Sequence, residues 1–119
     1  MSELLALIIE DDLAIAGIYE EALHLAGYET ETIENGRLAI QRIQEIVPAL
    51  ILLDLHLPEV TGEEVLNAIR STPALSETTV FITTADHLFA EQLRAEVDLV
   101  LLKPISLMQL RDMALRFRP

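Results

Sequence analysis

Residues 49–58 read ALILLDLHLP, an apolar run that ends at Asp54 and is followed by a loop through Pro58. Pro48 stands directly before the first residue of this run and stops any preceding helix. A short run that is apolar almost throughout is typical of a strand covered on both faces of a sheet. We therefore predict a buried strand over residues 49–53, with Asp54 at its carboxyl end.

Strand-like and helix-like stretches alternate along the whole chain on both sides of this strand. Strands are predicted over residues 4–9, 28–33, 49–53, 79–84 and 98–102. Helices are predicted over residues 12–26, 35–47, 62–71, 86–95 and 106–116. This alternation predicts an α/β fold with a parallel sheet and right-handed crossovers. The strand over residues 28–33 is more polar, which places it at or near an edge of the sheet.

Length, composition and charge exclude several classes of protein. The 119 residues, 51% of them hydrophobic, suit a single domain over residues 1–119 with a sizeable core. The apolar runs are far shorter than the ~20 residues of a membrane span, and no secretory signal is visible at the N-terminus. The absence of cysteine excludes disulfides and thiolate metal sites and favours a cytoplasmic location. A net charge of -12 disfavours nucleic acids and anionic membranes as partners.

Polar side chains stand where four of the predicted strands end. Glu10 and Asp11 follow the first strand, Asp54 closes the third, Thr84 ends the fourth and Lys103 follows the fifth. Open α/β sheets place their sites at this edge. Clustered carboxylates repel one another, and a hard divalent cation such as Mg²⁺ relieves the repulsion. With an ammonium from Lys103 and a hydroxyl from Thr84 beside Asp54, the pattern favours a site for phosphoryl transfer.

These segments together resemble the receiver domain of two-component response regulators, over essentially the full length of the chain. The matching segments are Ile8-Ile9-Glu10-Asp11-Asp12, Asp54-Leu55-His56-Leu57-Pro58 through Gly62, Thr84-Ala85 and Lys103-Pro104. Each is weak alone, and the four in order are highly specific. The resemblance implies a doubly wound (βα)₅ sheet of the flavodoxin-like, CheY-like type, with strand order 2-1-3-4-5.

The resemblance also implies a metal site. Asp11 and Asp54 would bind Mg²⁺ directly, together with the backbone carbonyl of His56, and Glu10 would assist through a water molecule. Asp12 is predicted to cap the helix that follows it rather than to bind the metal.

Around the metal, the resemblance assigns Asp54 as the phosphoacceptor that becomes an aspartyl phosphate. Thr84 would donate a hydrogen bond to the phosphoryl group, and Lys103 would form an ion pair with it. The Lys103–Pro104 peptide bond is expected to be cis.

Such a domain is a signalling module that promotes only its own phosphotransfer and autodephosphorylation. Its implied partners are a sensor histidine kinase or a phosphotransfer protein, and an output domain or a downstream protein. The expected assembly is a monomer or a weak, phosphorylation-dependent dimer. The apolar residues Leu13, Ala14, Ile15 and Ile105 flank the site, where a phosphohistidine domain would dock, although core packing explains at least Ile15.

Two other functions compete with this interpretation. A haloacid-dehalogenase phosphatase also uses a strand-end Asp and Mg²⁺, but it carries a second Asp where this chain has His56. A phosphorylation-independent interaction module is the third hypothesis, because Val100 stands where many receivers carry a switching aromatic residue. A nucleotide-binding fold is disfavoured by the lack of a Gly-rich phosphate loop. We further hypothesise that His56 and Asp86 tune the lifetime of the phosphoryl group.

Overall fold

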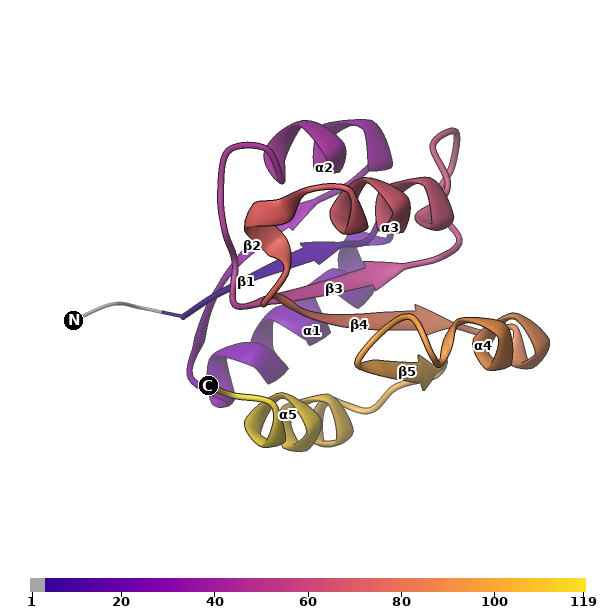
Figure 1. Ribbon diagram of the computed structural model, residues 1–119. Helices are drawn as coiled ribbons and strands as arrows, with labels where there is room; N and C mark the ends of the chain where they lie inside the picture. Colours follow the sequence, from indigo (N-terminus) through magenta and orange to yellow (C-terminus); the bar gives the residue numbers. More distant parts are fainter. Residues whose placement is uncertain (1–3) are drawn as a thin grey trace.

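The computed structural model describes residues 4–119, and its centre is one sheet of five parallel strands (Figure 1). The strands are β1 (Leu4–Ile9), β2 (Tyr28–Ile33), β3 (Leu50–Asp54), β4 (Thr79–Thr84) and β5 (Leu99–Leu102). Their order across the sheet is β2-β1-β3-β4-β5. The predicted fold class, strand order and edge position of β2 are therefore confirmed.

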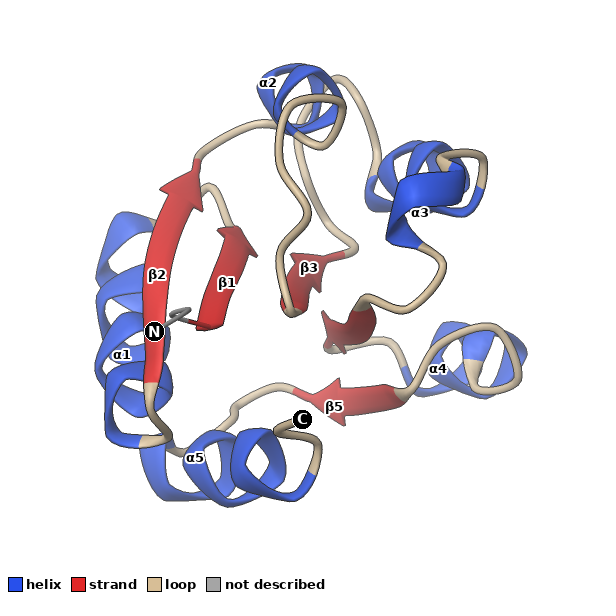
Figure 2. Cartoon of the chain, turned by 60° about the vertical axis from the view of Figure 1, so that its left-hand side comes forward, coloured by secondary structure: helices blue, strands red, loops and turns tan. Residues whose placement is uncertain are grey.

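Helices cover both faces of the sheet, as the apolar strands require (Figure 2). They are α1 (Leu13–Leu25), α2 (Gly36–Arg42), α3 (Gly62–Arg70), α4 (His87–Leu93) and α5 (Leu107–Arg116), with a 3₁₀ turn η1 (Pro73–Leu75) after α3. One core cluster packs α1 and α5 against one face, and a second packs α2, α3 and α4 against the other. Among the described residues, no helix has the length and apolar character needed to cross a bilayer.

Strand β3 shows how the two core clusters share one strand. Leu50 and Leu52 face α1 and α5, whereas Ile51 and Leu53 face α2 to α4. All five residues of β3 are buried, because successive side chains point to opposite faces and both faces are covered. Asp54 continues the parity of Leu50 and Leu52, so its side chain leaves the strand on the α1/α5 side.

Helix α2 ends earlier than predicted, at Arg42 rather than near Val47. After the N–H of Ile43 bonds to the Ala39 carbonyl, the next bonds run from Gln44 to Gln41 and from Glu45 to Arg42. These i to i−3 bonds tighten the chain into 3₁₀-type turns before Pro48 leads into β3. The remaining predicted elements are present, and their bounds differ from the prediction only at the ends.

Candidate functional site

The register of the sheet brings the charged strand ends to one level. Ile9 of β1 pairs with Leu53 of β3, so the residues that follow, Glu10 and Asp54, meet at the carboxyl edge. On the other side of β3, Asp54 itself pairs with Thr83 of β4. Parallel strands deliver their carboxyl ends to one edge, and the register therefore brings Asp54 at the end of β3 level with the residues that directly follow β1.

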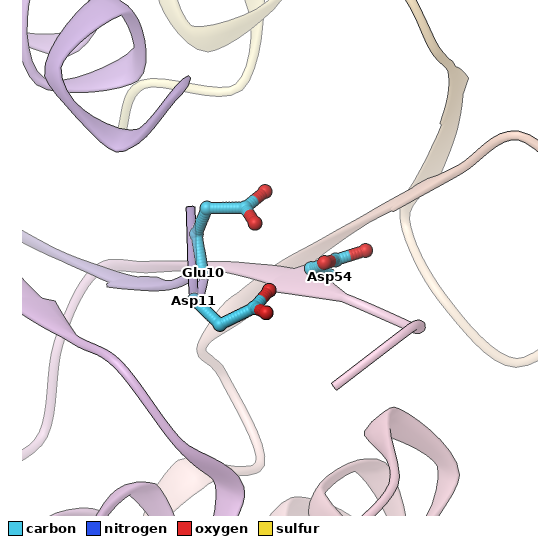
Figure 3. Close-up of side chains that lie close together, drawn as sticks. All are labelled: Glu10, Asp11 and Asp54. Atoms are coloured by element: carbon cyan, nitrogen blue, oxygen red, sulfur yellow. The ribbon is translucent and has the colours of Figure 1, made fainter. Parts of the chain in front are cut away.

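Three carboxylates converge at this edge (Figure 3). Oxygens of Glu10, Asp11 and Asp54 all lie within 4.8 Å of one another. Glu10 and Asp54 are buried, with exposed fractions of 1% and 3%, whereas Asp11 is exposed. Asp12 is turned away from the group and caps α1, since its side chain accepts hydrogen bonds from the N–H groups of Ala14 and Ile15. The predicted capping role of Asp12 is confirmed.

Lys103 supplies the positive charge that the carboxylates need. Its Nζ lies 3.2 Å from Oε1 of Glu10 and 3.4 Å from Oδ1 of Asp54. Burial acts to lower the pKa of Lys103, but the neighbouring carboxylates of Asp54 and Glu10 outweigh it and raise the pKa. Lys103 is therefore held as an ammonium, and the Lys103–Pro104 bond beyond it is cis, as predicted.

One ammonium is not enough to balance three carboxylates. Burial raises the pKa of Glu10 to about 7, and the charge of Asp54 adds to the effect, against the opposing hydrogen bond from Asp12 and the attraction of Lys103. The cluster thus carries an excess of about two negative charges when all its acids are ionised. A divalent cation fits this excess, and carboxylate oxygens are the ligands that Mg²⁺ prefers. The donor set is therefore compatible with a magnesium site.

The two oxygens of Asp54 differ in their partners. Its Oδ1 accepts a hydrogen bond from the N–H of His56 at 3.2 Å and also takes the ion pair with Lys103. Within residues 4–119, the hydrogen bonds and ion pairs of this carboxylate all go to Oδ1. Oδ2 is consequently the oxygen left for a metal ion or for an electrophile.

The close packing of α3 on the end of β3 explains why residue 62 is a glycine. A Cβ atom at this position would lie 2.4 Å from Cα of Leu55 and 2.7 Å from the carbonyl oxygen of Asp54. The first turn of α3 therefore packs directly on the backbone that carries Asp54. The N–H of Gly62 also donates to the carbonyl of Leu55 at 3.2 Å, which ties the two ends of the loop together.

Thr84 lies at the same edge but does not point to Asp54. It shares the parity of Val80 and Ile82, whose side chains face the α2–α4 side of the sheet. Its hydroxyl lies 3.1 Å from Nε2 of His56 and accepts the N–H of Asp86 at 3.0 Å. One group at this edge is formed by the side chains of Glu10, Asp11, Asp54 and Lys103. The hydroxyl of Thr84 belongs to a second group, with His56 and the N–H of Asp86.

Tyr19 of α1 is a neighbour of the site that the sequence pattern did not reveal. Its side chain is buried, and burial raises the pKa of the Tyr19 phenol, while the charge of Lys103 opposes this. Glu10 and Asp54 also act on the phenol electrostatically. Its spacing from Ala16 and Leu23 on the buried face of the helix was the available signal, but that signal indicates core packing and not proximity to charges.

An apolar hollow opens beside the acids. It lies between α1 and the segment after β5, and its walls come from Ile15, Ile18, Tyr19, Ala85, Lys103, Pro104 and Ile105. Of the four apolar residues expected to flank the site, Ile15 and Ile105 line this hollow. Leu13 and Ala14 are exposed at the start of α1.

Known proteins share both the sequence pattern and the fold. The family model described as the response regulator receiver domain matches residues 6–115. The transcriptional regulatory protein TrcR of Mycobacterium tuberculosis is 30% identical over 111 residues, which cover 92% of this chain and 43% of TrcR. The polar-differentiation response regulator DivK of Brucella anthropi is 31% identical over 103 residues, which cover 84% of each protein. The chemotaxis response regulator CheY4 of Vibrio cholerae aligns with a TM-score of 0.88 at 25% identity, over 98% of this chain and 99% of that one. The chain therefore spans less than half of TrcR and most of DivK.

Proposed function

The chain belongs to the response regulator receiver domain family, and from this premise we propose that it accepts a phosphoryl group from a phosphohistidine donor onto Asp54. The reaction is Mg²⁺-dependent, and residues 1–119 act as a single receiver domain. The observation that carries the proposal is the position of Asp54, buried between two further carboxylates and the ammonium of Lys103. Such a group has a nucleophilic oxygen and preorganised charge in one place.

The transfer is a displacement at phosphorus. An oxygen of Asp54 attacks the phosphorus, and the bond from phosphorus to the donor imidazole nitrogen breaks as the new bond to oxygen forms. The electron pair of the broken bond stays on the imidazole, which leaves as a neutral ring when its other nitrogen carries a proton. Attack of water on the aspartyl phosphate later releases inorganic phosphate and restores Asp54.

The chain's own residues hold the charges of this reaction. Lys103 already contacts Oδ1 of Asp54, and its ammonium is within reach of a phosphoryl oxygen attached to the same carboxylate. Thr84 donates its hydroxyl to another phosphoryl oxygen. Mg²⁺, held by Asp11, Asp54 and the carbonyl of His56 with help from Glu10, would neutralise further charge on the phosphoryl group.

The proposed partners follow from the hollow beside the site. A histidine kinase or a phosphotransfer protein must bring its imidazole to Asp54, and the apolar walls from Ile15, Ile18 and Ile105 offer a surface for it next to Lys103. The form phosphorylated on Asp54 then acts on an output domain or a downstream protein. TrcR, of which the matched segment covers 43%, is named a transcriptional regulatory protein.

Intact mass measurement after incubation with acetyl phosphate and Mg²⁺ tests the proposal. We expect one added phosphoryl group on the wild type, none on Asp54→Ala and none when Mg²⁺ is chelated. Asp112→Asn is the matched control, because Asp112 is an exposed acid on α5 that pairs only with its neighbour Arg111 among the described residues. Retention of the adduct in Asp54→Ala would refute the assignment of the acceptor.

The same experiment separates the competing functions. No adduct on the wild type would favour a phosphorylation-independent interaction module. Steady release of phosphate from many phosphomonoesters would favour a phosphatase. Thermal unfolding adds a test of the metal site, since Mg²⁺ at ~100 times its dissociation constant should stabilise the fold by ~2.7 kcal/mol.

A further inference from the structure

The hydroxyl of Thr84 is held by two groups that belong to different loops. Thr84 is fully buried, with an exposed fraction of 0%. From the loop after β3, Nε2 of His56 lies 3.1 Å from Oγ1 of Thr84. From the start of α4, the N–H of Asp86 donates to the same oxygen at 3.0 Å. The His56 side chain itself is exposed, so the imidazole covers the hydroxyl from the solvent side.

The direction of the bond between His56 and Thr84 follows from their donors and acceptors. A threonine hydroxyl has one proton to donate and lone pairs that accept. The N–H of Asp86 already uses the oxygen as an acceptor. The buried hydroxyl proton still needs an acceptor, and Nε2 of a neutral imidazole is the acceptor within reach. The arrangement that leaves no buried hydroxyl proton unpaired has Thr84 donating to Nε2 of His56 and the ring proton on Nδ1, and we assign the contact in this way.

From this geometry we propose that His56 is a positioning residue that holds the Thr84 hydroxyl away from Asp54 and opposes the phosphorylated state. The inference rests on the proposed function, in which Thr84 donates to the phosphoryl group. One proton cannot be given to Nε2 of His56 and to a phosphoryl oxygen at the same time. The bond to His56 must break before Thr84 can turn toward Asp54, so its strength sets a penalty on phosphorylation.

Within residues 4–119, the hydrogen bonds of the Thr84 hydroxyl go to His56 and Asp86. Val100 lies in the same core cluster as Ile82 on the face that Thr84 shares, and its side chain has no hydrogen-bonding atom. Asp86 is engaged at its own side chain, which caps α4 by accepting the N–H of Phe89. The resting position of the Thr84 proton therefore depends on the imidazole of His56.

Beryllofluoride, a tetrahedral mimic of the phosphoryl group, allows a double-mutant cycle on the whole chain in the presence of Mg²⁺. The four proteins are the wild type, His56→Leu, Thr84→Val and the double variant. A neutral hydrogen bond of ordinary strength predicts that His56→Leu binds beryllofluoride roughly 2- to 10-fold more tightly than the wild type. In the Thr84→Val background the same change at His56 should have no effect, because no hydroxyl is left to hold.

Two control variants separate this mechanism from a general effect of removing a histidine. His24→Leu removes a second histidine–threonine pair, since Nε2 of His24 lies 2.9 Å from Oγ1 of Thr30 on the exposed side of α1. It should bind beryllofluoride as the wild type does. His56→Gln keeps an acceptor at the end of the side chain and should restore affinity close to that of the wild type.

The outcomes distinguish this inference from the proposed function. Equal affinity of the wild type and His56→Leu, or an equal gain in the Thr84→Val background, would overturn the role of His56 while Asp54 chemistry stands. Failure of the wild type to bind beryllofluoride would overturn the proposed function and this inference with it. A measurement without any phosphoryl mimic adds a second test. The ¹⁵N spectrum of neutral His56 should show Nε2 as the unprotonated nitrogen, and Thr84→Val should change that signal; an Nε2–H form in the wild type would refute the assignment.

Discussion

Replacement of Gly62 by Ala should disrupt the acid-bearing edge of the sheet although it adds only a methyl group. The new Cβ would lie 2.4 Å from Cα of Leu55, 2.9 Å from its carbonyl carbon and 2.7 Å from the carbonyl oxygen of Asp54. These are backbone atoms, which cannot rotate away as a flexible side chain can. Either α3 or the end of β3 must move.

The magnitude follows from two opposing effects. Overpacking of a tight site costs about 1–3 kcal/mol, and a collision with backbone belongs at the upper end of that range. Gly62 does not have a positive φ, so alanine is compatible with its backbone and reduces the entropy of the unfolded chain, which offsets about 0.4–1 kcal/mol. We expect a net loss of about 1–2 kcal/mol in the free energy of unfolding. For a domain of this size, each kcal/mol of that loss lowers Tm by about 3–5 °C.

Urea and thermal unfolding, with and without Mg²⁺, measure both parts of the effect. Because the displaced backbone carries Asp54 and the carbonyl of His56, Gly62→Ala should also lose part of the stabilisation that Mg²⁺ confers. Gly17→Ala is the matched control. Among residues 4–119, apart from the neighbouring backbone of α1 itself, no atom lies within 4 Å of the added Cβ. Gly17 is exposed in the middle of α1, so a gain of about 0.5–1 kcal/mol is expected.

Opposite signs for the two glycines are the signature of the close approach at Gly62. If Gly62→Ala were as stable as the wild type and kept its full response to Mg²⁺, the packing of α3 on the backbone of Asp54 would not position the site. A loss of stability in both variants would attribute the effect to helical glycines in general.

Three further predictions concern charge and coupling. Asp11→Asn removes one of three clustered negative charges, so it should raise the free energy of unfolding of the metal-free protein by up to about 1 kcal/mol. The same variant should bind Mg²⁺ more weakly in a calorimetric titration. A metal-free variant less stable than the wild type would contradict the repulsion among the three carboxylates. Burial raises the pKa of Glu10 to about 7, above its value in the unfolded chain, so the folded state holds more protons in that window. The metal-free protein should therefore lose roughly 1–3 kcal/mol of stability as the pH rises from about 5 to about 7, and Glu10→Gln should remove that loss in urea titrations; identical pH profiles would count against it. Beryllofluoride should speed hydrogen exchange at the amide of Asp86, because Thr84 leaves it; unchanged protection would mean that the signal does not reach α4 by this bond.

Most of the fold could be predicted because its signals are local. The apolar run before Asp54 and the alternation of strands and helices identified the α/β class, and side-chain caps such as Asp12 and Ser106 mark helix starts as expected. The family predicted from four short motifs is confirmed by the match over residues 6–115. The early end of α2 was not predictable, since no Gly or Pro marks it and the residues that follow, Ile43 and Ile46, still pack in the core cluster beside α2.

The sequence by itself determined which chemical groups reach the carboxyl edge, because strand parity and strand ends depend on the order of residues along the chain. It therefore places Glu10, Asp11, Asp54 and Lys103 at one edge. Only the tertiary structure decided which other residues contact the groups at this edge or the backbone that carries them. The bond between His56 and Thr84, the burial of Tyr19 beside Lys103 and the collision that excludes a side chain at Gly62 join segments far apart in sequence. Whether such contacts form depends on shifts of a few tenths of an ångström in how the elements pack, and the order of residues along the chain does not specify those shifts.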